Sequence, residues 1–346
     1  MTDRLSPTRE SPFVFEGIPV LVLAFRRADV LAKTLEALRL ASPSAIYVNV
    51  DGPRGDVSED ATNVLRVHQL LDDFEAECPV HLRYNESNRG LGVGVCEAID
   101  WFFSFEHHGV ILEDDVYISS SSLDLARLLL LEFESHDDVG SISLFNPVPT
   151  GVIREPQATY RFSSIPSSQY WGTWRNRWRT SRELRDPKQA RIPEKMLSEV
   201  GGKRFAQMYL ASWSSTTSVD EISWEGRWLA THFSQGWIVP TTNANYSLHL
   251  GFNSLATNSI EQPSWYPTEL SEWNGALDAP FTNQVDRHAD RWYLNRRFGL
   301  SAQMRFRRTV RRLFPGLTTF WRGRMVKQIQ PPDSTKEQNG LDAFRQ

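Results

Sequence analysis

The sequence predicts an α/β protein with a mostly parallel, doubly wound central sheet. Three observations support this fold class. Apolar runs of strand length recur early in the chain, segments with helical apolar spacing separate them, and polar residues follow each run. Continuous apolar runs are typical of parallel strands that are buried on both faces. Alternation of strands and helices over about 120 residues therefore favours helices on both sides of one sheet.

The first half of the chain contains the regular alternation. Strands are expected at residues 19–25, 45–50, 80–84 and 110–112. Helices are expected between them, at residues 29–40, 59–75 and 92–105. Apolar side chains recur in these helices at the spacing of one helix face. Asp29 is expected to cap the first helix, and His107 and His108 are expected at the C-terminal end of the third.

The second half of the chain is less regular. Short strands are expected at residues 116–118, 139–145, 236–240 and 245–253. Helices are expected at residues 123–134, 193–210, 224–233 and 284–298, with further basic helical sequence up to residue 191. The Pro-rich residues 146–168 are expected to be irregular. We expect one domain over residues 18–300, preceded by a flexible N-terminus of residues 1–17.

The composition excludes several classes of protein. The chain has 346 residues, of which 40% are hydrophobic and 23% charged, as is ordinary for a soluble globular protein. A net charge of −4 gives no global signal for nucleic-acid binding. Cys78 and Cys96 form neither a disulfide framework nor a metal quartet, so a cytoplasmic location is expected. No apolar run approaches the roughly 20 residues of a membrane helix.

The C-terminal tail, residues 301–346, is basic. Its residues 305–327 include eight Lys or Arg, no acid, and interleaved aromatic side chains such as Phe306 and Trp321. Basic stretches with aromatic residues bind anionic membrane surfaces. Peripheral contact of residues 303–327 with the inner face of the membrane therefore stands as one interpretation. A solvated tail, or a basic face packed on the acidic domain, stands as the other.

Three consecutive acids follow the fourth expected strand. Glu113, Asp114 and Asp115 come directly after residues 110–112, and a second apolar run follows them. Like charges this close repel one another, and burial disfavours their ionisation. A divalent cation would relieve this cost, because carboxylate oxygens suit Mg²⁺ and Mn²⁺. A solvated acidic turn is the alternative.

Polar residues also follow the other expected strands. Arg26 and Arg27 follow the first strand, Asp51 follows the second, and residues 85–89 follow the third. The carboxyl ends of parallel strands meet at one edge of a sheet, and ligands bind outside that edge. We therefore expect these side chains to surround the same site as the acidic triplet.

In this order, the residues resemble the GT-A-type nucleotide-sugar glycosyltransferases, and more narrowly the N-acetylglucosaminyltransferase I-like group and related bacterial proteins. The resemblance covers roughly residues 18–255, and residues 111–115 carry it best. It implies a GT-A fold with a C-terminal acceptor-side extension: residues 18–145 would bind the nucleotide sugar and residues 146–300 the acceptor. It further implies metal-dependent, inverting transfer of a hexosyl group from a nucleoside-diphosphate sugar, with a UDP-sugar favoured. The acceptor would be a hydroxyl of a glycan or glycolipid in bacterial surface polysaccharide synthesis.

The resemblance also implies roles for the acidic triplet. Asp115 would bind Mn²⁺ or Mg²⁺ on the donor diphosphate, Asp114 would lie near the ribose, and Glu113 nearer the sugar. Arg27 matches the arginine beside the nucleotide, with Arg26 as its competitor.

Further positions carry over in the same way. Asp51 matches the residue that holds the base, and Asn88, Arg89 and Gly90 match a loop that approaches the nucleotide and phosphates. Residues 245–252 resemble a segment that closes over the donor.

Glu225, after Trp224, matches the catalytic base, a position where the resemblance calls for the shorter Asp. Asp220 and Glu221 are its rivals, and a helix first-turn acid is the structural alternative. Tryptophans that could form the floor of an acceptor site are Trp171, Trp174 and Trp178, for which core packing is the alternative.

Two other functions stay open. One is a non-catalytic protein that binds a sugar or nucleotide on a GT-A fold. The other is a sugar nucleotidylyltransferase, which would require a Gly-rich phosphate loop after the first strand. Residues 25–28 contain no glycine, which disfavours it.

Overall fold

The computed structural model describes residues 17–184, 191–214, 223–252 and 262–299. The chain divides into two compact units, residues 1–294 and residues 295–346, and the sheet belongs to the first unit. The expected basic tail and nearly all of the expected flexible N-terminus lie outside the described residues. Among the described helices, none has the length and apolarity needed to span a membrane.

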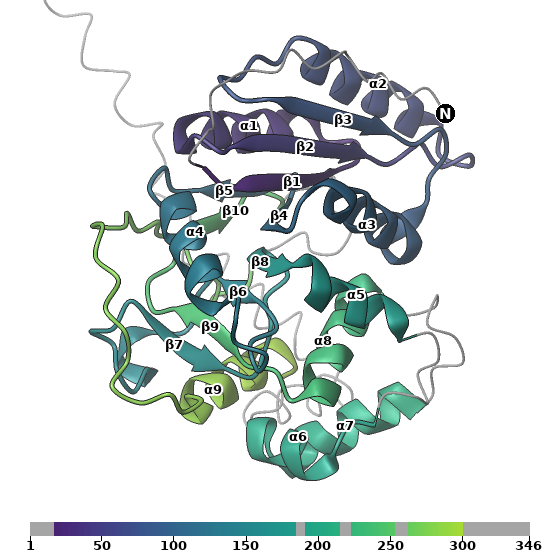
Figure 1. Ribbon diagram of the computed structural model, residues 1–346. Helices are drawn as coiled ribbons and strands as arrows, with labels where there is room; N and C mark the ends of the chain where they lie inside the picture. The colour runs from purple at the N-terminus through teal and green to yellow at the C-terminus, as the bar shows by residue number, and fades with distance from the viewer. Residues whose placement is uncertain (1–16, 185–190, 215–222, 253–261, 300–346) are drawn as a thin grey trace, which may run out of the picture. The chain divides into compact units, whose positions relative to one another are not determined.

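The predicted α/β fold is confirmed. The strands of the main sheet are β1 (Pro19–Ala24), β2 (Ala45–Val50), β3 (Val80–Tyr84), β4 (His108–Glu113), β6 (Ile142–Ser143), β7 (Tyr160–Ser163), β8 (Tyr170–Trp174) and β9 (Val239–Thr242). Within the described residues, these eight strands form a mixed, mostly parallel sheet in the order β3-β2-β1-β4-β8-β6-β9-β7, compatible with a Rossmann-like fold (Figure 1). β8 runs antiparallel to both β4 and β6. β5 (Val116–Ile118) and β10 (Ser247–His249) form a separate antiparallel pair.

Helices connect most of these strands. They are α1 (Ala28–Ala41), α2 (Ser58–Asp72), α3 (Val95–Phe105), α4 (Ser122–Phe133), α5 (Arg175–Glu183), α6 (Glu194–Gly201), α7 (Lys203–Ser214), α8 (Trp224–Gln235) and α9 (Arg287–Arg297). A π-helical turn, Gly90–Gly94, precedes α3. The ends of α8 follow from the sequence: the Ser223 hydroxyl accepts a hydrogen bond from the Gly226 amide, and Gly236 ends the helix with a φ of 69°.

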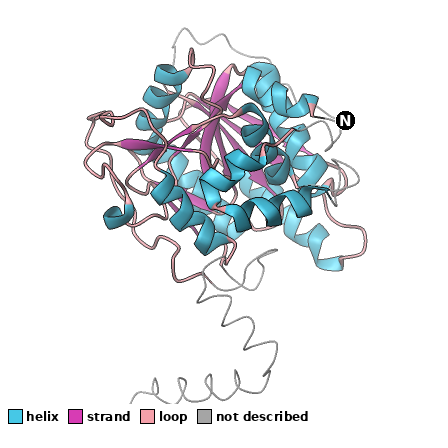
Figure 2. Ribbon diagram, turned by 90° about the horizontal axis from the view of Figure 1, so that it is seen from below, coloured by secondary structure: helices cyan, strands magenta, loops and turns pink. Residues whose placement is uncertain are grey.

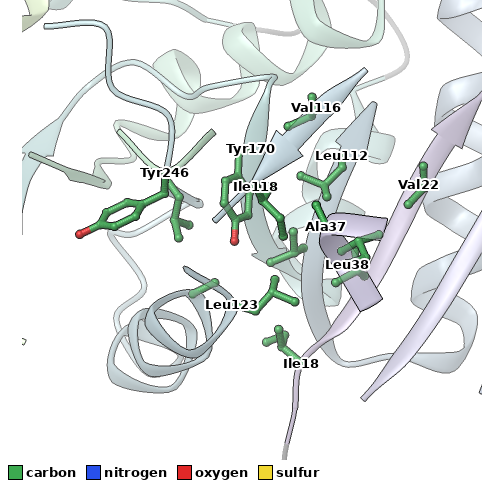
Figure 3. Packing of buried hydrophobic residues seen from close by; sticks show 14 of the residues in the cluster. Ile18, Val22, Ala37, Leu38, Leu112, Val116, Ile118, Leu123, Tyr170 and Tyr246 are labelled. Atoms are coloured by element: carbon green, nitrogen blue, oxygen red, sulfur yellow. The ribbon is translucent and has the colours of Figure 1, made fainter. Parts of the chain in front are cut away.

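Helices pack on both faces of the sheet, as predicted. Successive side chains of β1 point to opposite faces, so Val20 and Val22 join one buried cluster and Leu21 joins another. The first cluster, part of which is shown in Figure 3, contains buried side chains of α1, α2 and α4. The second contains those of α3, α5 and α8. In Figure 2 the strands accordingly run between helices.

Some predicted helix ends are wrong. α1 begins at Ala28, so Asp29 lies in the first turn and is not the N-cap. An acid in the first turn still interacts favourably with the helix dipole. α3 ends at Phe105, and His108 is the first residue of β4, so the two histidines do not cap this helix.

The second half departs further from the prediction. Gly202 has a φ of 85°, which few other residues adopt, and separates α6 from α7 where one helix was expected. Only two residues of the expected strand 139–145 belong to β6. β7 lies within residues 146–168, which were expected to be irregular. The sequence did not indicate this strand, because four residues carry little periodic signal. α5 ends at Glu183, and residues 185–190 of the expected basic helix lie outside the described residues.

Candidate functional site

The acidic triplet lies at the carboxyl end of β4, beside the carboxyl end of β1. These two strands are parallel neighbours. Arg27, which lies shortly after β1, therefore meets Asp114 and Asp115, which follow β4. The Arg27 guanidinium donates a hydrogen bond to Asp114 Oδ1, and its Nη2 lies 2.7 Å from Asp115 Oδ2. Asp114 and Asp115 are 3% and 2% exposed, so this is a buried pair of acids with one cation.

One arginine does not neutralise three carboxyl groups. Burial, together with the charges of Asp115 and Asp114, raises the pKa of Glu113 to about 8. Burial also raises the pKa of Asp114 to about 6, although Arg27 opposes this shift. Of these two groups, Glu113 therefore favours its protonated form near neutral pH, and a bound cation would favour its ionised form.

Asp115 has one carboxylate oxygen without a partner. Its Oδ1 is buried and accepts no hydrogen bond from a described residue. Its Oδ2 lies 3.7 Å from His249 Nε2, and its backbone oxygen accepts a hydrogen bond of 2.7 Å from the Leu250 amide. A Cβ on Gly251 would lie 2.0 Å from Oδ2. The segment after β10 is therefore held closely against Asp115. These contacts leave Asp115 Oδ1 without a hydrogen-bond partner among the described residues.

These residues fit a divalent cation that is shared with a phosphate ligand. The described residues contain no cluster of three or more His, Cys, Asp or Glu side chains arranged to hold a metal ion. Mg²⁺ and Mn²⁺ sites of phosphate-binding enzymes commonly use only one or two carboxylates, with substrate oxygens completing the shell. Asp115 Oδ1 provides such a carboxylate oxygen. His249 Nδ1 accepts a hydrogen bond of 2.9 Å from the Gly251 amide, which places the proton of the neutral ring on Nε2.

The structure distinguishes between the two candidate arginines. Arg26 Nη1 donates to Asp60 Oδ1 over 2.8 Å, and Arg54 binds the same carboxylate. Asp60 is fully buried in α2, and hydrogen bonds, chiefly from Arg54, lower its pKa to about 2. Arg26 is thus tied to the start of α2, and Arg27 is the arginine that reaches the acidic triplet.

Asp51 organises the loop after β3. Its carboxylate accepts hydrogen bonds from the Arg89 amide at 2.8 Å, from the Gly90 amide at 3.0 Å and from Asn85 Nδ2 at 3.1 Å. The structure therefore brings Asp51 and the loop after β3 together. The proposed contact of Asp51 with a base stays a prediction, since much of this carboxylate is already used by the loop.

The other loop residues bind within the protein. Asn88 Nδ2 donates to the Gly52 carbonyl over 3.0 Å, and Arg89 forms a two-bond pair with Glu97 of α3, at 2.7 and 3.1 Å. The Arg89 side chain is about half exposed, so its pair with Glu97 is open to solvent. Gly90 has a φ of 72°, which lets the chain turn sharply into the π-helical turn.

Glu225 lies near the triplet although it is 110 positions from Asp115 along the chain. Ser168 Oγ donates a hydrogen bond of 2.8 Å to Glu225 Oε1. The charge of Glu225 contributes to the raised pKa of Glu113, so the two groups interact electrostatically. The rivals Asp220 and Glu221 lie outside the described residues.

Of the two interpretations of the tryptophans in residues 171–178, the structure confirms core packing and contradicts an acceptor floor. Trp171, Trp174 and Trp178 are 0%, 2% and 1% exposed and belong to the core. Trp171 stacks on Trp224 with the ring centres 5.5 Å apart, which anchors the first turn of α8 and so positions Glu225. Trp228 packs on the buried His232 ring in the same region.

Sequence reasoning missed Ser168 and Gly251. A single serine carries no pattern, and its role depends on the packing of α8 beside β8. Gly251 belongs to the segment that was expected to close over a donor, but only the structure reveals that a Cβ at this position would collide with Asp115 Oδ2. A comparison with models of known protein families and a search of curated proteins both find no match for this chain.

Proposed function

We propose that this protein is a metal-dependent glycosyltransferase of the GT-A type that transfers a sugar from a nucleoside-diphosphate sugar to an acceptor hydroxyl. The observation that carries the proposal is an acidic triplet in which Asp114 and Asp115 are buried and paired with Arg27, while the buried Oδ1 of Asp115 has no hydrogen-bond partner among the described residues. A further carboxylate, that of Glu225, interacts electrostatically with Glu113 of the triplet. The order of the residues along the chain, described above, supports the same class of enzyme.

The donor end of the reaction requires charge compensation. When bound at Asp115, a divalent cation such as Mn²⁺ or Mg²⁺ would neutralise negative charge on the departing diphosphate. Arg27 is a fixed cation at the same place and would assist in that role. Asp114 keeps Arg27 in position through their hydrogen bond. The nucleotide would extend toward the carboxyl ends of β2 and β3, where Asp51, Arg89 and Gly90 form the loop.

The acceptor end of the reaction requires a base. Glu225 would take the proton of the acceptor hydroxyl as its oxygen attacks C1 of the donor sugar. The new C–O bond forms while the bond between C1 and the diphosphate oxygen breaks, and the diphosphate leaves with that electron pair. One base and no covalent intermediate give inversion at C1. The hydrogen bond from Ser168 fixes the orientation of the Glu225 carboxylate.

The proposal includes a division of labour between the two parts of the chain. Residues 18–145 would bind the donor, with a UDP-sugar favoured, and residues 146–300 would form the acceptor side. The acceptor would be a glycan or glycolipid used in surface polysaccharide synthesis. These assignments rest on the sequence resemblance.

Nucleotide binding tests the proposal directly. We expect UDP with Mn²⁺ to raise the melting temperature of the wild-type protein more than UDP or Mn²⁺ alone, because a ligand of the native state stabilises it. Asp115→Asn is expected to abolish the Mn²⁺-dependent part of the shift. Asp124→Asn, which changes an exposed acid of α4, is the matched control and is expected to retain it.

Two outcomes would contradict parts of the proposal. An unchanged Mn²⁺-dependent shift in Asp115→Asn would refute the metal assignment. Binding of UDP, GDP or dTDP with metal, but no turnover of any corresponding nucleotide sugar, would instead indicate a non-catalytic binding protein. GDP and dTDP thus serve as the comparison for the favoured uridine donor.

A further inference from the structure

A pocket lies apart from the acidic triplet, since none of residues 113–115 lines it. Its volume is about 580 Å³, within the usual range for small-molecule sites, and loops within residues 146–159, 243–246 and 266–278 line it. Tyr266 lines the pocket and also contacts His249 and Phe252, with ring-centre distances of 5.9 and 5.2 Å. The pocket therefore shares Tyr266 with the wall of the candidate active site.

Asparagine side chains make the pocket rigid. Asn243 Nδ2 donates to the carbonyls of Glu155 and Ala158 at 3.0 and 2.8 Å. Asn245 Nδ2 donates to the carbonyls of Ser247 and Glu269 at 2.7 and 3.1 Å. These bonds tie the three lining loops together. The pocket is consequently preorganised, which reduces the entropy lost when a ligand binds.

Aromatic rings supply apolar surface among the polar groups. Tyr246, Tyr266 and Trp273 all line the pocket. The Trp273 indole N–H donates to the Ala276 carbonyl over 2.8 Å, so what this ring offers a ligand is its apolar surface. In Figure 3, Tyr246 lies at the edge of the buried cluster with its hydroxyl directed away from the core. Apolar ring faces beside hydroxyl, amide and carboxylate groups match a sugar ring, which has C–H faces and a rim of hydroxyls.

The charge of the pocket excludes an anionic ligand. The described residues that line it include Glu269, Glu272 and Asp278 but no Lys, Arg or His. Phosphate, sulfate or carboxylate groups would be repelled here. The acidic triplet with Arg27 and the pocket thus differ in chemistry, since only the first has a cation available for a diphosphate.

From this geometry we infer that the pocket binds an uncharged saccharide. The saccharide-binding site rests only on the pocket and does not depend on the proposed glycosyltransferase function. Phosphorylated or uronic acid units would be excluded from this position.

Saturation-transfer NMR on the full-length protein tests the inference. The probes are glucose, galactose, mannose, N-acetylglucosamine, lactose and maltose, with glucose 6-phosphate and glucuronic acid as anionic probes and tetramethylammonium as a cationic probe. We expect at least one neutral sugar to bind with a Kd on the order of 1–10 mM. We expect the anionic analogues to bind at least about tenfold more weakly.

Variants locate the binding. Trp273→Ala is expected to weaken it by at least about tenfold, and Tyr246→Phe, which preserves core packing, by about threefold. Asp115→Asn lies in the other site and is expected to leave saccharide binding within about twofold of wild type. The UDP and Mn²⁺ melting shift, measured on the same samples, reports separately on the proposed donor site. Saccharide binding without that shift would refute the donor site and support the pocket.

Four results would overturn the inference. These are no binding of any neutral sugar, equal binding of the anionic analogues, binding of tetramethylammonium in place of sugars, and unchanged sugar binding in both pocket variants.

Discussion

Replacement of Arg27 by methionine is expected to destabilise the protein strongly at neutral pH. The Arg27 side chain is 15% exposed, and the side chains of its partners Asp114 and Asp115 are 5% and 3% exposed. Methionine fills similar space but leaves two buried carboxyl groups without a cation. Removal of one partner of a buried ion pair typically costs about 3–5 kcal/mol. We expect a loss of this size in the free energy of unfolding at about pH 8.

The loss is expected to shrink in acid. With Arg27 present, burial already raises the pKa of Asp114 to about 6, and removal of the cation raises this pKa further. The folded variant then binds protons more tightly than the unfolded chain, so its instability is fullest above the folded-state pKa. As the pH falls toward about 5, Asp114 takes up a proton and the difference from wild type is expected to decrease by at least about 1 kcal/mol.

Urea unfolding followed by circular dichroism at both pH values measures this difference. Arg39→Met is the control, because Arg39 pairs with Glu36 on the surface, where both side chains are about half exposed. That variant is expected to show a much smaller loss, because water screens exposed pairs. An Arg27→Met variant no less stable than Arg39→Met, or a loss that grows in acid, would refute the buried ion-pair reasoning.

Three further variants test the site. Glu225→Gln is expected to lower sugar transfer by at least about 100-fold, with donor affinity within about threefold, because this carboxylate would act on the acceptor. Gly251→Ala would place a Cβ 2.0 Å from Asp115 Oδ2; we expect about 1–3 kcal/mol of destabilisation and weaker Mn²⁺-dependent UDP binding. Glu113→Gln removes a carboxyl group whose pKa is raised to about 8, chiefly by burial. The folded protein binds the Glu113 proton more tightly than the unfolded chain does, so wild type loses stability as the pH rises toward 8. The variant lacks this proton, and its free energy of unfolding is expected to fall less than that of wild type between about pH 5 and pH 8.

Each variant has a matched control and its own measurement. For Glu225→Gln, the rate of UDP release at saturating donor is measured, and Ser168→Ala, which keeps the Glu225 carboxylate, is the control. Equal rates in the two variants would argue against Glu225 as the base. Denaturant midpoints and UDP titrations compare Gly251→Ala with Gly151→Ala, where a Cβ meets open space; equal behaviour would show that Gly251 is not needed. Unfolding across the pH range compares Glu113→Gln with Glu134→Gln on the surface, and parallel curves for all proteins would contradict the raised pKa.

The first three strands and their polar ends could be predicted from the sequence. The expected strand at residues 45–50 coincides with β2, and that at residues 80–84 coincides with β3. Buried parallel strands appear in the sequence as continuous apolar runs, and apolar residues of the connecting helices recur at helical spacing. Both patterns can be recognised within a short stretch of sequence. The parallel order β3-β2-β1-β4 then brings Arg27 and Asp115 to one edge, as expected from the alternation.

The second half of the sheet depended on distant pairing. β8 joins the sheet antiparallel between β4 and β6, although the sequence alone predicts no pairing for residues 170–174. β6 and β8 have only two and five residues, so each carries little periodic signal, and their stability comes from partners far along the chain. From the sequence alone, core packing and a binding surface were both open for the tryptophans of this region, and the structure shows that they belong to the core.

The acidic triplet shows what the sequence determined by itself and what the tertiary structure decided. Three adjacent acids after an apolar strand already indicated a site with an excess of negative charge, because chain order fixes that density. The tertiary structure decided which arginine pairs with these acids. Arg26 and Arg27 are neighbours in sequence, yet Arg26 pairs with Asp60 of α2 and Arg27 pairs with the triplet. The approach of Glu225 and the open oxygen of Asp115 are tertiary results too, since burial and partner choice depend on elements that are distant along the chain.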